Sequence, residues 1–133
     1  MQAESQGHDA SQPDIQSLHQ QLVDKVKTAG YITSPRVEEA FRAVPRHLFL
    51  PHVPPQDVYQ DRPIMTKMLD GQYVSSSSQP TIMAIMLEQL DLQPGQRVLE
   101  IGAGTGYNAA LMAHIVGETG QVVTIDIDQD IVE

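Results

Sequence analysis

The segment that most constrains this chain is a short apolar run followed by three closely spaced glycines near residue 100. It reads Arg-Val-Leu-Glu-Ile-Gly-Ala-Gly-Thr-Gly over residues 97–106. The pattern predicts a strand at 97–101, a glycine turn, a helix at about 107–116 and a second strand at 121–127. Strand, turn, helix and strand in this order form a right-handed βαβ unit with parallel strands. We therefore expect an α/β fold with a parallel sheet flanked by helices.

Two strands are too few for a stable parallel sheet, which must be covered on both faces. A further helical pattern begins near Asp130, three residues before the last residue given. We therefore expect the chain to be the N-terminal fragment of a longer protein. We also expect residues 1–133 alone to be inactive.

The region before this unit divides into a tail and a helical extension. Residues 1–13 are small and polar without periodicity, which predicts a disordered tail. Apolar spacing predicts one helix from Asp14 to about Gly30 and a second that begins at Ser34-Pro35 and stops before Pro45.

The next segments are predicted from their prolines, serines and methionines. Residues 46–70 contain too many prolines for a regular element, so we expect an irregular connection with extended pieces at 48–50 and 64–65. Residues 71–79 hold four consecutive serines and are expected to form a polar loop. Pro80 opens a helix to about Leu90, whose methionines we interpret as core packing.

Charge and composition narrow the function. The net charge of −9 disfavours a protein that grips nucleic acid through its phosphates. From Glu88 onward, eight acidic residues accompany a single basic one, Arg97, which indicates either a solvated face or a site for a positively charged ligand. No run approaches the roughly 18 apolar residues of a membrane span. The absence of cysteine excludes thiol chemistry and fits a cytoplasmic protein.

The glycine turn predicts a nucleotide site with a carboxylate beside it. The glycines stand at 102, 104 and 106, and Tyr107 occupies the third-glycine position of the dinucleotide fingerprint. Glu100 would repel a pyrophosphate but suits the cationic amino-acid part of S-adenosylmethionine. The predicted cofactor-binding residues are Glu100, Gly102, Ala103, Gly104, Gly106 and Asp126. Asp126 ends the second strand, where an acid can accept both ribose hydroxyls.

Two neighbouring acids compete with Asp126 for the ribose. Asp128 and Asp130 follow it closely, and we interpret both as capping residues of the next helix. His47 and His52 lack a third ligand, so no metal site is predicted.

Residues 98–106 resemble motif I of class I S-adenosylmethionine-dependent methyltransferases. The rest of the chain from Ile32 to Glu133 resembles one family of that class, the protein-L-isoaspartate O-methyltransferases. The resemblance rests on Ser34–Leu50, Tyr59–Asp61, Asp70–Gln72, Ser78–Pro80, Val98–Met112 and Val122–Asp126. It implies a Rossmann-like class I methyltransferase fold, with a helical extension and substrate loop at 14–79 and the first half of the cofactor-binding domain at 80–133.

The resemblance also implies the reaction. Such enzymes methylate the α-carboxylate of isoaspartyl residues in proteins or peptides, either for repair through a succinimide or for peptide maturation. The family loop usually reads G-x-x-T-I-S-x-P, whereas here it is longer and rich in serine. Ser78 aligns best with the family serine, and Ser78 and Ser77 are the predicted catalytic residues. We expect a monomer. The open alternatives are a nucleotide-dependent oxidoreductase and an inactive fragment with only a binding role.

Overall fold

The computed structural model describes residues 14–126. The predictions for residues 1–13, for Ile127, for Asp128 and for a helix near Asp130 lie outside the described residues. The helices are α1 (Ile15–Thr28), α2 (Pro35–Ala43), the 3₁₀ turn η1 (Arg46–Phe49), α3 (Pro55–Val58), α4 (Pro80–Leu90) and α5 (Tyr107–Val116). The strands are β1 (Ile64–Leu69), β2 (Gln72–Ser77), β3 (Arg97–Ile101) and β4 (Gln121–Ile125).

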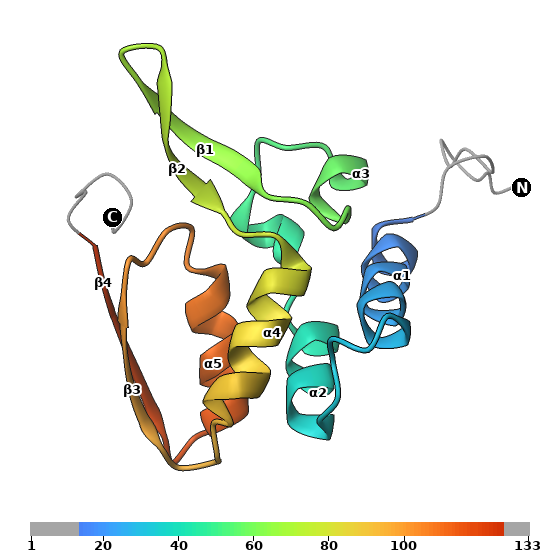
Figure 1. Cartoon of the computed structure of the whole chain (residues 1–133), viewed down its shortest axis with the longest axis vertical. Helices are drawn as coiled ribbons and strands as arrows, with labels where there is room; N and C mark the ends of the chain where they lie inside the picture. Colours follow the sequence, from blue (N-terminus) through green and yellow to red (C-terminus); the bar gives the residue numbers. More distant parts are fainter. Residues whose placement is uncertain (1–13, 127–133) are drawn as a thin grey trace, which may run out of the picture.

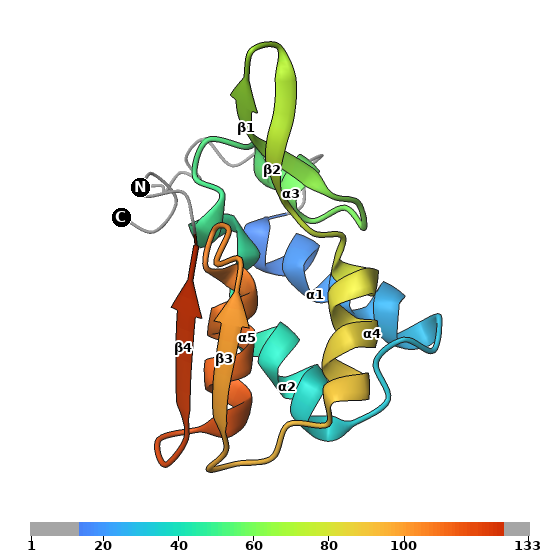
Figure 2. The same ribbon diagram turned by 60° about the vertical axis from the view of Figure 1, so that its left-hand side comes forward.

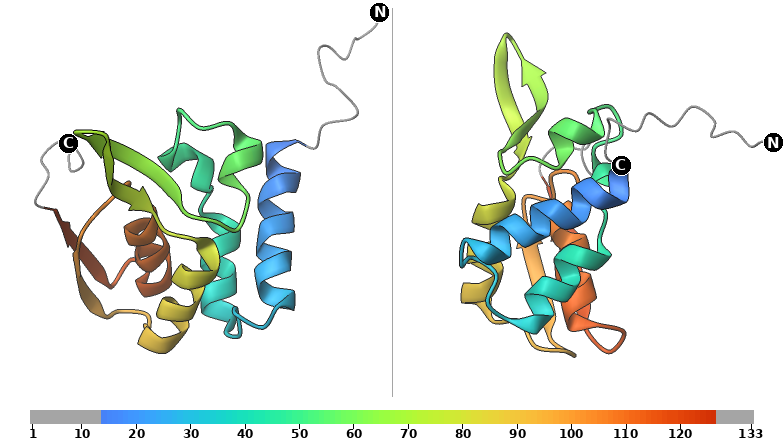
Figure 3. Two further views of the ribbon diagram at one scale, coloured as in Figure 1. Left: turned by 45° about the horizontal axis from the view of Figure 1, so that its top comes forward. Right: turned by 90° about the vertical axis from the view of Figure 1, so that its right-hand side faces the viewer.

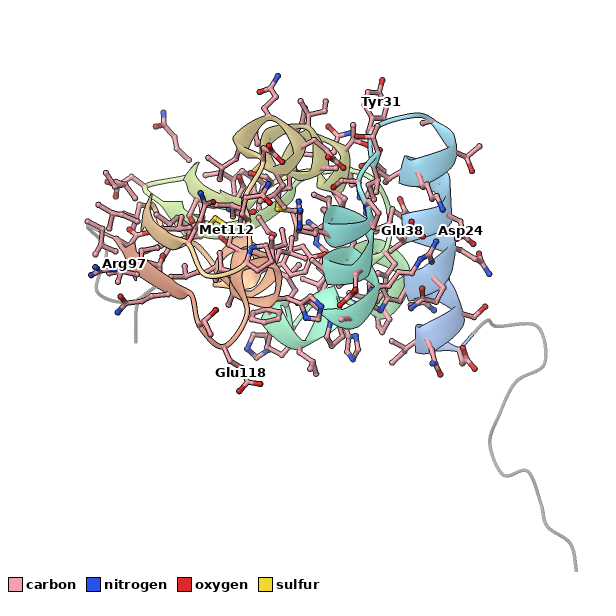
Figure 4. All side chains as sticks on the ribbon, turned by 90° about the horizontal axis from the view of Figure 1, so that it is seen from below. Asp24, Tyr31, Glu38, Arg97, Met112 and Glu118 are labelled. Carbon is pink, nitrogen blue, oxygen red and sulfur yellow. The ribbon has the colours of Figure 1, made fainter. Side chains whose placement is uncertain are left out.

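The first two helices begin where their capping residues predict. The Asp14 carboxylate accepts a hydrogen bond from the N–H of Ser17 at 2.7 Å, and the Ser34 hydroxyl caps α2. Arg42 on α2 joins the two helices by pairing with Asp24 of α1 at 2.8 Å and with Glu38 of α2 at 2.9 Å. Figure 4 shows Asp24 and Glu38 at the junction of α1 and α2.

The expected irregular connection at 46–70 is partly wrong. Residues 48–50 are not extended, because the Leu48 N–H donates to the Pro45 carbonyl at 3.2 Å and the chain turns as η1. Pro54 and Pro55 start the short helix α3 rather than break one, since proline lacks only an N–H that is unpaired in the first turn anyway.

The expected loop at 71–79 is also wrong, because most of it is a strand. β1 and β2 form an antiparallel hairpin in which Ile64 lies opposite Ser77. Asp70 and Gly71 connect them with positive φ angles of 50° and 76°. An Asp-Gly pair with both φ angles positive is typical of the tight hairpin turn that matches strand twist. This dipeptide is the signal that the sequence interpretation missed. Figure 3 shows the hairpin extending beyond the helices.

The βαβ unit is confirmed, with β3 and α5 at the predicted residues. β3 and β4 are parallel, with Val98 opposite Val122 and Glu100 opposite Thr124. β4 ends at Ile125. Figure 2 shows the two strands side by side with α5 behind them.

The elements stack in layers from the sheet to α1 (Figure 1). α5 covers one face of the β3–β4 sheet, α2 packs on α5, and α1 packs on α2. The buried core combines residues of these helices with residues of α4 and the connecting segments. Within residues 14–126, the other face of the sheet is left open, with Leu99 61% and Ile101 78% exposed. No helix in this range is long and apolar enough to cross a membrane.

Candidate functional site

A cavity of about 300 Å³ lies between the end of β2 and the glycine turn after β3. It brings together six of the eight predicted site residues, which are Ser77, Ser78, Glu100, Gly102, Ala103 and Gly104. Its wall also includes Ser76, Met83, Met86, Ile101, Thr105, Tyr107 and Asn108. A volume of this size falls at the lower end of small-molecule sites in proteins.

The glycine turn carries the chain across the ends of both parallel strands. The N–H groups of Gly102 and Ala103 donate to the Ile125 carbonyl at 2.7 and 3.0 Å. Gly102, Gly104 and Gly106 have φ angles of 96°, 57° and 91°. Side chains other than glycine rarely adopt these angles, so glycine is required for the turn and leaves the backbone accessible from the cavity.

Asp126 and Gly106 support the turn without lining the cavity. The Asp126 carboxylate accepts a hydrogen bond from the Gly104 N–H at 3.2 Å. It therefore fixes the middle of the turn, and its role as a ribose acceptor stays a prediction. Gly106 caps α5, and a Cβ there would lie 3.8 Å from the Phe49 ring.

Glu100 lies in the cavity wall with both oxygens hydrogen-bonded. The Thr124 hydroxyl donates to one oxygen at 2.6 Å, and the Asn108 amide donates to the other at 2.9 Å. Each carboxylate oxygen has a second lone pair, so Glu100 keeps the capacity to accept from a ligand. The sequence interpretation missed Thr124 and Asn108, because their role depends on strand pairing and on the first turn of α5.

The serines face the glycine turn from the opposite side. Ser77 is buried, Ser76 and Ser78 are exposed, and Ser75 is not part of the cavity wall. A Cβ built on Gly104 would lie 4.0 Å from the Ser76 carbonyl oxygen. Two segments 28 residues apart in sequence, at Ser76 and Gly104, thus lie close together across the cavity.

Arg46 is a residue of this site that the sequence interpretation missed. It starts η1, is fully buried, and lies behind Ser77 and against the Tyr107 ring. Burial raises the pKa of the Tyr107 phenol above its usual range, so Tyr107 contributes a neutral ring to the cavity wall. Only tertiary packing brings Arg46 to the serines.

The methionines of α4 do more than fill the core. Met83 is buried, as predicted, whereas Met86 is 47% exposed, and both line the cavity. The prediction that the α4 methionines pack in the core is therefore wrong for Met86. The face of α4 that carries Met86 turns toward the cavity and toward the open face of the sheet. Among residues 14–126, no group of three or more histidine or acidic side chains is arranged to hold a metal ion.

Three comparisons relate this chain to known proteins. The sequence model of the family "Protein-L-isoaspartate(D-aspartate) O-methyltransferase (PCMT)" matches residues 16–133. A protein-L-isoaspartate O-methyltransferase of Methanopyrus kandleri is 44% identical over 107 residues, covering 80% of this chain and 45% of the relative. One of Thermotoga maritima is 42% identical over 103 residues, covering 77% of this chain and 32% of the relative. The chain thus spans less than half the length of these relatives.

Solved structures agree with the sequence relatives. A protein-L-isoaspartate O-methyltransferase superimposes with a TM-score of 0.75 at 40% identity, covering 85% of this chain and 35% of the other. A Plasmodium falciparum structure of the same class, in complex with S-adenosyl-L-homocysteine, gives a TM-score of 0.68 at 25% identity, covering 86% and 51%.

These matches confirm the fold class, which is the N-terminal part of the class I methyltransferase fold, and they favour a methyltransferase over an oxidoreductase. With the family model matching nearly all of its described residues, the chain belongs to the protein-L-isoaspartate O-methyltransferase family.

Proposed function

We propose that the full-length protein carrying this sequence transfers a methyl group from S-adenosylmethionine to the α-carboxylate of isoaspartyl residues in proteins or peptides. The observation that carries the proposal is the cavity itself. It places a carboxylate and a glycine turn on one side and the hydroxyls of Ser77 and Ser78 on the other. A site of this kind can hold two reactants against each other.

The glycine side fits S-adenosylmethionine. Glu100 offers a carboxylate to a cationic amino-acid group, and the glycine turn lets the backbone approach a ligand closely. Asp126, anchored on the Gly104 N–H, would accept the ribose hydroxyls. The Plasmodium falciparum relative, solved with S-adenosyl-L-homocysteine, supports this choice of ligand.

The serine side fits a carboxylate acceptor. When bound, S-adenosylmethionine supplies an electrophilic methyl group. A carboxylate with a pKa of about 4 is ionised at neutral pH, so the acceptor oxygen needs no general base. The task left to Ser77 and Ser78 is to orient that oxygen through hydrogen bonds.

The remaining inferences rest on composition and exposure. We infer a monomeric cytoplasmic protein that does not bind nucleic acid, which the net charge of −9 and the lack of cysteine support. We also infer that residues 1–133 alone do not catalyse methyl transfer, because Leu99 and Ile101 leave one sheet face uncovered within residues 14–126. Light scattering of the full-length protein tests whether it is a monomer.

The direct test is transfer of a tritium-labelled methyl group by the full-length protein to an isoaspartyl peptide. The matched control is the same peptide with a normal aspartyl residue. We expect base-labile label on the isoaspartyl peptide only. Equal labelling of both peptides would contradict the proposed substrate. So would the absence of label from a protein that is shown, in a separate titration, to bind S-adenosyl-L-homocysteine. The same assay on the 133-residue chain is expected to give no label.

A further inference from the structure

Arg46 connects the two sides of the cavity from behind. Its Nη2 donates to the Ser78 carbonyl oxygen at 3.1 Å and to the Ser77 hydroxyl oxygen at 3.4 Å. Its guanidinium carbon lies 5.7 Å from the centre of the Tyr107 ring, at the start of α5. One side chain therefore contacts both the serine segment and the helix that follows the glycine turn.

The burial of Arg46 is costly for the protein. The side chain has no exposed surface, and among residues 14–126 its Nε and Nη1 have no hydrogen-bond partner. Burial lowers the pKa of Arg46, while attraction to Tyr107, Asp61 and Tyr59 opposes that change, and a guanidinium stays charged in proteins. A buried cation without a paired carboxylate costs several kcal/mol. A negative charge bound in the adjacent cavity would offset part of that cost.

The hydrogen bond from Arg46 also restricts where the Ser77 hydroxyl proton can point. Because the Ser77 oxygen accepts from Arg46, its own proton must point elsewhere. Ser77 lines the cavity, so the cavity is where a carboxylate can receive that proton in a hydrogen bond. A hydroxyl that accepts from a cation is polarised and becomes a stronger donor.

We propose that Arg46 is a positioning residue for the acceptor carboxylate and acts through Ser77, whose hydroxyl it directs into the cavity while it fixes the Ser78 carbonyl. This inference rests on the proposed function and names the group behind the serine side. The buried positive charge also favours an anionic acceptor over a neutral one.

A double-mutant cycle on the full-length protein tests the coupling. Arg46→Met keeps the bulk of the side chain and removes its charge and donors. We expect Arg46→Met to lower kcat for the isoaspartyl peptide about tenfold, with S-adenosyl-L-homocysteine affinity within about twofold. In a Ser77→Ala background, Arg46→Met should lower kcat by less than about threefold further, because the group it acts through is gone.

Arg42→Met is the matched control. Arg42 lies in the last turn of α2, four residues before Arg46, and pairs with Asp24 and Glu38 outside the cavity wall. We expect it to leave kcat within about twofold of the parent, since these partly exposed ion pairs lie outside the cavity and surface pairs contribute about 1 kcal/mol or less to stability.

Each outcome decides the inference. Equal losses from Arg46→Met with and without the Ser77 hydroxyl would show that Arg46 does not act through Ser77, and would overturn it. If Arg46→Met does not fold, Arg46→Lys replaces it, since a single ammonium group does not reproduce the planar guanidinium fork, and the same coupling is expected. A Ser77→Ala variant with parental kcat overturns the inference by itself.

If the parent does not methylate the isoaspartyl peptide, the proposed function fails as well. If it does and the Arg46 variants match it, only this inference fails.

Discussion

The two sides of the cavity are built in different ways. The glycine side is mostly backbone, with three glycines at positive φ held by hydrogen bonds to Ile125 and Asp126. The serine side is the end of a hairpin, where the buried Arg46 donates to the Ser77 hydroxyl and the Ser78 carbonyl. A backbone turn suits a ligand shared by many enzymes, whereas side chains on a hairpin suit the part of the reaction that differs between them. We therefore expect changes on the glycine side to affect cofactor affinity and changes on the serine side to affect turnover.

The largest expected effect comes from reversing the charge on the glycine side. Glu100→Lys removes the acceptor for Thr124 and Asn108 and places a cation where the ligand is expected to bring one. Because juxtaposed like charges cost several kcal/mol, affinity for S-adenosyl-L-homocysteine should fall at least about a hundredfold. Calorimetry on the full-length protein measures it.

The control for that change is Glu118→Lys. Glu118 lies in the exposed turn between α5 and β4 and carries the same charge change away from the cavity (Figure 4). Its affinity should match that of the parent. Equal weakening by both variants would mean that net charge, and not Glu100, governs binding.

Ser78→Ala should have the next largest effect, on turnover. Loss of a hydrogen bond to a charged acceptor costs about 1.5–3 kcal/mol. This corresponds to roughly a ten- to hundredfold decrease in kcat for the isoaspartyl peptide. Ser75→Ala is the matched control, because Ser75 lies on β2, three residues before Ser78, and outside the cavity wall. A Ser78→Ala variant with parental kcat would remove Ser78 from the mechanism.

The smallest effect concerns a region away from both sides. Burial lowers the pKa of His19 on α1, and this outweighs the hydrogen bond from its Nε2 to the Phe41 carbonyl, at 2.6 Å, which acts in the opposite direction. Between the lowered pKa and about 6.5, the unfolded chain binds more protons, so stability falls as the pH falls.

Thermal unfolding at pH 7.5 and 5.5 measures this decrease, which should be of the order of a few degrees. His19→Gln should reduce the pH dependence, whereas replacing the exposed His52 with Gln should leave it unchanged. If His19→Gln retains the full pH dependence, other groups cause it.

How well each side could be predicted follows from how it is built. The glycines, Glu100 and Asp126 of the glycine side could be predicted, because an apolar strand, spaced glycines and an acid after the next strand are local patterns. Thr124 and Asn108 could not, because they meet Glu100 only through strand pairing and the first turn of α5. The hairpin was missed because the prolines before it and the serine run outweighed the Asp70-Gly71 turn signal. Arg46 was missed for another reason. No local pattern marks a buried arginine, and its role exists only once η1 packs against the end of β2.

The most direct test of a divided cavity is calorimetric titration of S-adenosyl-L-homocysteine into the full-length parent, Asp126→Ala and Ser78→Ala. Removing Asp126 leaves buried ligand hydroxyls and the Gly104 N–H without their acceptor, at a cost of about 1–3 kcal/mol. We expect Asp126→Ala to weaken binding roughly ten- to a hundredfold and Ser78→Ala to change it less than about twofold. Parental affinity in a folded Asp126→Ala variant, or an equal loss in Ser78→Ala, would contradict the division of roles between the glycine side and the serine side.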